Sequence, residues 1–519
     1  AIGSIEFVGV STDYLSLKGT GGQGRSETSI VEFRVRDENN NPASQKEVTF
    51  ELTNDAGGIS ISPTTAQSNN DGLVQTVVRS GDVPGAVRVL AYIKPANNDP
   101  GNHDNRISAV SDVLIISTGL PDNNSFSLSA DILNPEGLDF DGEIVNINVH
   151  LADHFNNPVP DGTSVFFTTE GGAVQPGCTT VGGACTVEWV SQDIRPFTDI
   201  SHYGNSSLNK CNLYFGNAAP CTFGILDPAF PLENLVRDRP LGGRFTILAH
   251  AVGEESFTDL NGNGVFDSGE YYNRYDLSEA FIDHNENDVY DGISCDDATD
   301  PCAPANSDGG EFEEFFDFNN DSTFTAADGV YNGYLCSAAA QAAGDCKWEP
   351  LHVRRNLHMV MSGSNSVMRV VTGTINGSCN NYIPNEAAGG TEIAALLEAS
   401  DVTNACDVAA IDLSAVPDIN DPAVDVGLSA VSMVLYFSDI FNNPMPAGTT
   451  VNITTNNGVL SGATSVIVGS TNRTLPMAMA FTVAREGEGN KITGGALTIT
   501  VTTPKQIITS MAITILDDR

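Results

Sequence analysis

The stretch VEFRVRDENNNPASQKEVTFELTNDAGG, residues 31–58, decides the fold of this chain, because its pattern returns twice. Residues 145–172 read VNINVHLADHFNNPVPDGTSVFFTTEGG, and residues 431–458 read VSMVLYFSDIFNNPMPAGTTVNITTNNG. In each copy an alternating apolar and polar run ends at an aspartate, and an Asn-Asn-Pro turn and a second alternating run follow; the aspartates are Asp37, Asp153 and Asp439. Asn tolerates left-handed backbone, Pro ends a strand, and β-branched residues at period two fill a buried face. Each copy is therefore predicted to be a β-hairpin unit of an antiparallel sandwich.

Length and charge narrow the possibilities further. The 519 residues exceed the usual domain size several-fold, and 50 Gly with 25 Pro favour turn-rich β structure. Acidic residues outnumber basic ones 66 to 24, which gives a net charge of -42. Because phosphate binding needs the opposite sign, we expect neither nucleic acid nor an anionic membrane as partner. No apolar run reaches the ~18 residues of a membrane span, so none is predicted.

The repeated pattern resembles the bacterial immunoglobulin-like (Ig-like) domains of the invasin and intimin type. The runs STGLPDNNSFSLSADILNPEG, DHFNNPVPDGTSVFFTTEGG, GEESFTDLNGNGVFDSGE and LHVRRNLHMVMSGS also resemble large Ig-like surface proteins of Gram-negative bacteria. The resemblance implies an all-β fold of three tandem Ig-like β-sandwiches and display at the cell surface or outside the cell. It implies no reaction.

The domains are expected at three successive ranges: 1–117, 118–350 and 351–519. Domains two and three are longer than a plain ~100-residue sandwich. We therefore expect irregular inserts, stapled by disulfides or binding calcium; they lie at about 193–240 and 254–350 in domain two and at about 376–425 in domain three. The features that distinguish this protein from a plain Ig-like sandwich are expected in these inserts.

The 10 cysteines fall into neighbouring couples along the chain. We predict five local disulfides: Cys178 with Cys185, Cys211 with Cys221, Cys295 with Cys302, Cys336 with Cys346, and Cys379 with Cys406. The alternative is a zinc site, but no CxxC motif occurs and no His lies at ligand spacing from a couple. Disulfides predict an oxidising compartment, and the start at Ala1 without a leader fits a secreted chain whose signal peptide was removed.

The strongest chemical signal lies in an acidic segment, residues 251–330. It holds 21 Asp and Glu against one basic residue, Arg274. Within it, DLNGNGVFDSGE matches the EF-hand calcium loop position for position, with Gly264 at position 6 for the sharp bend. The ligands expected at positions 1, 3, 5, 7, 9 and 12 are Asp259, Asn261, Asn263, the Val265 carbonyl, Asp267 and Glu270. Calcium is the expected cofactor, because alternate oxygens on a tight loop suit a hard cation.

Two weaker echoes follow in the same segment. In DHNENDVYDGIS the register is repeated by Asp283, Asn285, Asn287, the Val289 carbonyl and Asp291, but Ser294 stands at position 12. In DFNNDSTFTAAD it is repeated by Asp317, Asn319, Asp321, the Thr323 carbonyl and Thr325, with Asp328 at position 12. Shared ligands are expected from other turns, among Glu254, Glu255, Asp276, Glu279, Glu311, Glu313 and Glu314. Flanking EF helices are not expected.

The alternative reading of these residues is a solvated acidic loop held by Asx-turns without metal, since Asp, Asn and Gly are turn formers. Repulsion among the carboxylates favours calcium, because the segment has almost no Lys or Arg to pair with them. We therefore predict that a chelator lowers the melting temperature and opens the insert to protease.

Signals of catalysis are missing from the sequence. It has no GxSxG, HExxH, phosphate loop or CxxCH, and its eight His are scattered, so no enzyme is expected. Trp189 and Trp348 each lie near a cysteine couple and are expected to pack in the core, with carbohydrate stacking as the alternative. Helices are expected at 335–346 and 391–400, within inserts.

Two functions remain open at this stage. The first is a structural protein, a stalk or self-assembled filament of Ig-like modules braced by calcium and disulfides. The second is an adhesin whose inserts bind a host, surface or polysaccharide ligand. The partner is accordingly a second copy of the chain or a cell-surface ligand.

Overall fold

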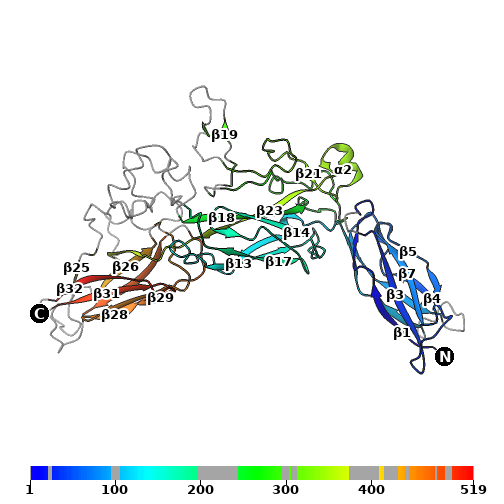
Figure 1. Ribbon diagram of the computed structural model, residues 1–519, viewed down its shortest axis with the longest axis horizontal. Coiled ribbons are helices and arrows are strands. Elements are labelled where there is room, and N and C mark those ends of the chain that lie inside the picture. The colour runs from blue at the N-terminus through cyan, green and yellow to red at the C-terminus, as the bar shows by residue number, and fades with distance from the viewer. Residues whose placement is uncertain are drawn as a thin grey trace.

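Figure 1 shows three β-sandwiches in a row, the first blue, the second cyan to green and the third orange to red. The computed structural model describes residues 2–21, 26–94, 106–196, 243–283, 286, 288–290, 293–294, 303–304, 313–372, 408, 410–413, 430–439, 441, 443–473, 476–485 and 494–517. Nearly all regular structure in these residues is β-strand, and the strands pair mostly antiparallel. The chain is thus an all-β protein of tandem Ig-like sandwiches, as the repeat predicts.

The first sandwich has sheets in the orders β1-β3-β7-β5 and β10-β9-β4-β6 and a small sheet β2-β11-β8. Its inward side chains alternate along the strands, as Val31, Phe33 and Val35 do, each fully buried. The strands are β1 (Ile2–Val10), β2 (Tyr14–Ser16), β3 (Thr28–Asp37), β4 (Glu47–Leu52), β5 (Ser60–Ser62), β6 (Thr65–Gln67), β7 (Leu73–Arg79), β8 (Gly85–Val87), β9 (Val89–Ile93), β10 (Ile107–Val110) and β11 (Leu114–Ser117).

The second sandwich has sheets in the orders β12-β13-β17-β15 and β16-β14-β18-β23. Its core is built around Trp189, which is fully buried and stacks on Phe245 with ring centroids 5.0 Å apart. The strands are β12 (Phe126–Ala130), β13 (Ile144–Leu151), β14 (Ser164–Thr169), β15 (Ala173–Val174), β16 (Gly177–Thr179), β17 (Ala184–Val190), β18 (Arg244–Gly253) and β23 (Leu351–Val360).

The third sandwich has sheets in the orders β24-β26-β30-β28 and β25-β32-β31-β27-β29. Phe437 and Phe481 are buried between them. The strands are β24 (Val367–Thr372), β25 (Ala410–Asp412), β26 (Ala430–Ser438), β27 (Thr450–Thr455), β28 (Val459–Gly462), β29 (Ser465–Ile467), β30 (Met477–Ala484), β31 (Gly494–Thr502) and β32 (Ile508–Leu516).

The prediction that each repeat forms a β-hairpin is wrong. The strands on either side of the Asn-Asn-Pro turn pair in opposite sheets of the sandwich: β3 and β4, β13 and β14, and β26 and β27. Both strands alternate because each sheet buries one face, so the alternation alone does not tell a hairpin from a crossover. The turn therefore carries the chain from one sheet to the other.

The predicted boundary between domains two and three also needs correction. Residues 351–360, placed in domain three from the sequence, form β23. This strand pairs with β18 along its whole length, from Arg244 opposite Val360 to Gly253 opposite Leu351. The passage to the third sandwich therefore lies between β23 and β24.

The insert of the second domain has little regular structure in its described part. It contains β19 (Ile293–Ser294), β20 (Ala303–Pro304), β21 (Tyr331–Asn332), β22 (Cys346–Lys347) and helix α2 (Ala338–Ala343). Helix α2 is shorter than the helix predicted at 335–346; Ser337 caps its start and Gly344, at φ +82°, ends it. The helix predicted at 391–400 lies outside the described residues. No helix in the described part of the chain has the length and apolar character of a membrane span.

This insert packs on the first sandwich as well as on the second. Phe257, Phe266, Tyr331 and Leu335 belong to the same buried apolar cluster as the core of the first sandwich. A residue of the insert's first loop, Gly264, lies near Pro84 and Phe155, one from each of the two domains. The insert thus covers the joint between domains one and two.

Candidate metal-binding insert

The insert between β18 and β23 contains carboxylates that are shielded from water. Glu254 and Glu255 lie directly after β18 and are fully buried, and Glu270 is 4% exposed. A buried carboxylate needs hydrogen bonds or a positive charge nearby. The hydrogen bonds of these carboxylates therefore show how the insert is built.

In the first loop the backbone winds around the carboxylate of Asp259. Its Oδ1 accepts the N–H groups of Gly262 and Asn263 at 2.7 and 3.2 Å, and its Oδ2 accepts the N–H of Gly264 at 2.9 Å. Gly262 and Gly264 have φ of +72° and +78°, a conformation that glycine adopts without strain. Alternate residues of the loop are thereby turned toward one centre, as the EF-hand spacing requires.

Glu270, at position 12, closes the first loop from the other side. Its Oε1 accepts the N–H of Leu260 and its Oε2 the N–H of Asp267, both at 2.9 Å. The side-chain amides of Asn261 and Asn263 both donate to Oδ2 of Asp267 at 2.8 Å. Bonds from Ser337 and from these two amides hold the pKa of Asp267 below its ordinary value. Asp259, Asn261, Asn263, Asp267 and Glu270 are therefore brought together.

The third loop repeats this arrangement. Oδ1 of Asp317 accepts the N–H of Asp321 at 3.1 Å, and its Oδ2 accepts the N–H of Ser322 at 2.8 Å. Asn320 and Ser322, at positions 4 and 6, have φ of +59° and +64° although neither is glycine. The oxygen of Asn319 accepts the N–H of Asp321 at 2.9 Å. The loop therefore winds around Asp317 as the first loop winds around Asp259.

The closing carboxylate of the third loop comes from elsewhere in the insert. Glu279 accepts the N–H groups of Phe318 and Thr325 at 3.0 and 2.9 Å, at the same positions, 2 and 9, that Glu270 takes in the first loop. Asp328, predicted from the sequence at position 12, instead pairs with Nζ of Lys347 at 2.6 Å. Glu279 therefore takes the place expected for Asp328.

The second loop is described only in part. Oδ2 of Asp283, a fully buried carboxylate, accepts the N–H of Asp288 at 2.7 Å, the bond that position 6 makes in the other loops. Positions 4 and 6, Glu286 and Asp288, again have positive φ, +59° and +61°. Val289 lies among the described residues, and Asn285, Asn287 and Asp291 lie outside them. The start of this loop thus has the same winding.

A fourth arrangement of the same kind is assembled from three separate segments. Asp276 takes the place of position 1, because its Oδ1 and Oδ2 accept the N–H groups of Asp328 and Gly329 at 3.1 and 2.8 Å. Glu255 takes the place of position 12, because it accepts the N–H groups of Leu277 and Asn332 at 2.7 and 2.8 Å. The Asp328 carboxylate accepts the N–H of Val330 at 2.9 Å, as position 5 does for position 7 elsewhere.

The sequence carries a signal for this fourth arrangement that was overlooked. Residues 328–332 read DGVYN, and residues 263–267, positions 5 to 9 of the first loop, read NGVFD. Gly329 has φ of +77°, close to Gly264 at +78°. The segment just before Asp328 does not supply position 1 of this arrangement. Position 1 is Asp276, which lies more than 50 residues before Asp328 in the chain. A search for continuous loops therefore does not find it.

The four arrangements form two pairs through the aromatic residue at position 8. Phe266 of the first stacks on Tyr331 of the fourth, with ring centroids 4.8 Å apart. Tyr290 of the second stacks on Phe324 of the third, with ring centroids 3.8 Å apart. These rings form apolar contacts between loops that are otherwise polar.

The donor set suits a hard cation in chemical type, since it consists of carboxylate, amide and main-chain oxygens. In the described part of the chain, no three His, Cys, Asp or Glu side chains are grouped closely enough to hold a metal by themselves. Asn side chains and main-chain carbonyls, such as those of Val265 and Thr323, would have to complete each shell. EF-type loops use both kinds of ligand, so the residues present fit calcium.

Glu254 joins the insert to the linker between domains one and two. Its Oε1 accepts the hydroxyl of Thr118 at 2.6 Å, and its Oε2 accepts the N–H of Tyr334 at 3.1 Å. Burial raises the pKa of Glu254 to about 8, and burial also raises that of Glu255 to about 7. Within the same joint, Asp153 accepts the phenol of Tyr14 at 3.3 Å.

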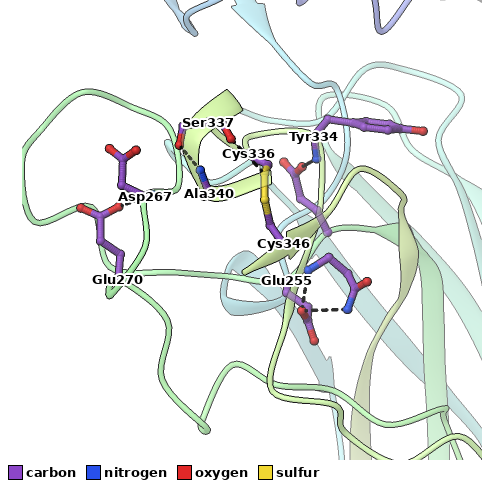
Figure 2. Close-up of a disulfide and its surroundings, with 10 residues drawn as sticks. Glu255, Asp267, Glu270, Tyr334, Cys336, Ser337, Ala340 and Cys346 are labelled. Atoms are coloured by element: carbon purple, nitrogen blue, oxygen red, sulfur yellow. Dashed lines mark hydrogen bonds between the residues drawn. A yellow bond between two sulfur atoms is a disulfide. The ribbon is translucent and has the colours of Figure 1, made fainter. Parts of the chain in front are cut away.

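Two of the five predicted disulfides lie among the described residues, and both are present. Cys178–Cys185 links β16 to β17, and Cys336–Cys346 links the start of the α2 segment to β22. Figure 2 shows the second disulfide beside Glu255, Asp267 and Glu270. Cys336 also forms an isolated β-bridge with Phe266, so this disulfide is attached to the first loop. The other couples, Cys211 with Cys221, Cys295 with Cys302 and Cys379 with Cys406, lie outside the described residues.

No protein-family model matches the chain. No curated protein matches it either. Among solved structures, FdeC, an Escherichia coli adhesin, is 9% identical over 99% of this chain and 96% of its own, with a TM-score of 0.27. The Yersinia pseudotuberculosis adhesin InvE is 15% identical over 48% of this chain and 55% of its own, with a TM-score of 0.16. The D0-D1 domains of intimin are 16% identical over 36% of this chain and 84% of their own, with a TM-score of 0.18.

FdeC and InvE are both described as adhesins. Likeness at this identity and TM-score carries no argument about this chain. What the chain binds is therefore argued below from its own residues.

Proposed function

We propose that the chain is an extracellular structural protein, a stalk or self-assembled filament of Ig-like modules braced by calcium and disulfides. The observation that carries the proposal is the repetition of one hydrogen-bond pattern around Asp259, Asp317 and Asp276. In each case a carboxylate accepts the N–H of position 6, and a glutamate accepts the N–H groups of positions 2 and 9. A solvated acidic loop has no physical reason to repeat this closure with glutamates from different segments.

The charge of the insert supports the same proposal. The segment 251–330 has 21 acidic residues and one basic residue. Several of its carboxylates are buried, and burial without a counter-charge is costly. Bound calcium would neutralise them and would add to the small apolar clusters that this part of the insert contains.

The place of the insert gives calcium a mechanical role. The insert packs on the core of the first sandwich through Phe257 and Phe266, and Glu254 bonds to the interdomain linker at Thr118. Loops that hold their shape only with calcium would therefore fix the first domain against the second. Rigid joints are what a stalk or filament needs, because flexible joints let modules fold back on each other.

Chelation of the intact chain tests this proposal. We expect EGTA to lower the calorimetric melting temperature of the second domain and to expose 254–350 to limited proteolysis, and excess calcium to reverse both effects. Magnesium at equal concentration is the control, since it is smaller and demands stricter geometry. An unchanged melt and digestion pattern in EGTA would remove calcium from the account.

An adhesin is the second candidate function. The observation that favours it is an aromatic pair on the insert, half-buried Tyr334 and exposed Trp348, next to the disulfide Cys336–Cys346. A structural module has no need to expose large aromatic side chains.

A further inference from the structure

The two tryptophans of the chain lie in opposite environments. Trp189 is fully buried, and its Nε1 donates to the carbonyl of Gly171 at 2.7 Å. Trp348, expected from the sequence to pack in the core, is 43% exposed. The expectation is therefore correct for Trp189 and wrong for Trp348. Burying a tryptophan stabilises a fold more than burying almost any other side chain, so an exposed tryptophan gives up a large favourable free energy.

Trp348 is one half of an aromatic pair. The ring of Tyr334 lies 5.5 Å from that of Trp348, between centroids, at an interplanar angle of 50°. The pairing of β21 with β22 brings the two rings together, because the N–H of Gly333 donates to the carbonyl of Lys347 at 3.2 Å. Gly333 directly precedes Tyr334, and Lys347 directly precedes Trp348. Their hydrogen bond therefore fixes the spacing of the two rings.

The backbone beneath the pair is held on both sides. Cys346 is tied to Cys336 by the disulfide, and the N–H of Tyr334 donates to buried Glu254 at 3.1 Å. Figure 2 shows Tyr334 reaching away from the disulfide while its main chain stays beside it. A rigid aromatic pair loses little conformational entropy when a ligand binds.

The charges around the pair select the kind of ligand. Residues 331–350 contain one basic side chain, Lys347, and it is already paired with Asp328 at 2.6 Å. Glu349, next to Trp348, is exposed. Residues 331–350 therefore offer an anionic ligand no unpaired basic side chain, and the whole chain carries -42. The exposed ring of Trp348, followed in the chain by an exposed carboxylate, instead suits a neutral ligand that combines hydroxyl donors with an apolar face.

We propose that Tyr334 and Trp348 form a stacking platform for a neutral polysaccharide, with Glu349 accepting hydrogen bonds from the sugar hydroxyls. A pyranose ring has an apolar face of C–H groups and a rim of hydroxyls, and so matches both parts of this surface. The proposal gives the adhesin candidate a ligand class. It can be tested separately from the calcium proposal.

The chain carries a built-in fluorescent readout, because it has two tryptophans and one of them is buried. Iodide should quench Trp348 and spare Trp189. Cellohexaose, chitohexaose and maltohexaose are titrated into the intact chain, and insoluble cellulose, chitin and mannan are used in sedimentation assays. At least one neutral glycan should shift the emission to shorter wavelength, reduce iodide quenching and sediment the protein, and the anionic polysaccharide alginate should do none of these.

Matched variants locate the site. Trp348→Ala and Tyr334→Ala should each lower the sedimented fraction at least tenfold, and Trp348→Phe should restore part of it. Tyr272→Ala is the control, since Tyr272 is 42% exposed on the same insert, and it should bind as the unchanged chain does. Near-ultraviolet circular dichroism checks that each variant is folded.

Two results would overturn the proposal: no neutral glycan binds the unchanged chain, or Trp348→Ala binds as well as Tyr272→Ala. Binding that is lost in EGTA while the melt also falls would show that the platform depends on the calcium-braced insert. Glycan binding in a chain whose melt ignores EGTA would leave the platform standing and the calcium proposal refuted.

Discussion

At the scale of single residues, the same turn is found with aspartates whose pKa values are shifted in opposite directions. In the turns of all three sandwiches the aspartate Oδ1 accepts the N–H groups two and four residues on; the aspartates are Asp37, Asp153 and Asp439. At Asp37, which is partly exposed, bonds led by the N–H of Asn41 lower the pKa of the carboxyl. At Asp439, which lies fully buried at the joint with the second domain, burial raises the pKa to about 7. Local sequence therefore sets the hydrogen bonds, and the surroundings set the charge.

A pH dependence of stability follows from Asp439. Its pKa is about 7 in the folded chain against an ordinary value of 3.8, so between these values the folded state binds a proton that the unfolded state has lost. The free energy of unfolding must then fall as the pH rises through this window, by at most about 1.4 kcal/mol per unit. Calorimetry of the intact chain should show the transition of the third domain moving to lower temperature between pH 4.5 and pH 7.5, beside a shift of the same sign from Glu254 and Glu255 in the second domain.

Two variants separate this effect from the general titration of an acidic protein. Asp439→Asn should flatten the pH dependence of that transition, because the titrating group is gone. Asp37→Asn should leave the dependence in place, because Asp37 titrates below the window. Identical pH profiles for Asp439→Asn and the unchanged chain would contradict the assignment.

The closing glutamates allow a second test, on the proposed calcium sites. Glu279→Gln should weaken calcium binding at the third loop at least tenfold, because the charge that Glu270 supplies in the first loop would be lost. Asp328→Asn should leave that loop's position-12 charge in place, since Asp328 contacts Lys347 and Val330 instead. Isothermal titration with calcium resolves the two variants, with Glu270→Gln as the reference for the first loop.

The opposite outcome would favour closure of the third loop by its own residue at position 12, Asp328. If Asp328→Asn weakened the third loop and Glu279→Gln did not, the sequence register would be right and the closure from a distant segment would be wrong.

At the scale of elements, the sequence predicts strands better than it predicts their partners. Alternation correctly gives strands such as β3, β13 and β26, because each buries one face. Alternation does not tell whether the next strand pairs in the same sheet or in the opposite one. It therefore predicts hairpins where the chain crosses between sheets. From the sequence, Glu255 and Glu279 are only members of a pool of shared ligands. Glu279 is 39 residues from Phe318 and Glu255 is 77 residues from Asn332, so their pairing depends on how the insert folds.

The Cys336–Cys346 disulfide is expected to hold one such element in place. Replacing both cysteines with serine should loosen α2 and β22 and cost about 2–4 kcal/mol of local stability, since the unfolded segment gains freedom. Because Cys336 forms a bridge with Phe266, the first loop should loosen too. Hydrogen exchange followed by mass spectrometry would show faster exchange at 259–270 and 335–347.

The other described disulfide provides the control. Cys178→Ser with Cys185→Ser should speed exchange only near β16 and β17, which lie in the second sandwich away from the loops. Equal effects of both double variants on the first loop would mean that the disulfides act through global stability.

At the scale of the whole molecule, the two joints are built differently from the same turn. Two residues after the turn aspartate stands Phe441 in the third domain, Phe155 in the second and Asn39 in the first. Phe441 is 7% exposed and belongs to the apolar core of the second sandwich. Phe155 is 37% exposed. The joint between domains two and three is thus closed by an apolar plug, whereas the joint between domains one and two is covered by the acidic insert.

The two joints should therefore respond to different changes. Phe441→Ala removes a buried aromatic, a loss of about 3–5 kcal/mol when a core site does not collapse, and should free the third domain from the second. Phe155→Ala is matched in turn position, but Phe155 is less buried than Phe441, so the substitution should cost less. In calcium, small-angle scattering of the intact chain should show a broader range of interdomain distances for Phe441→Ala but not for Phe155→Ala. In EGTA, the unchanged chain should show a broader range of distances between domains one and two. A chain that stays equally extended after Phe441→Ala would mean that the polar contacts of this joint, such as the bond from Gly363 to Asp439 at 3.0 Å, hold it without the plug.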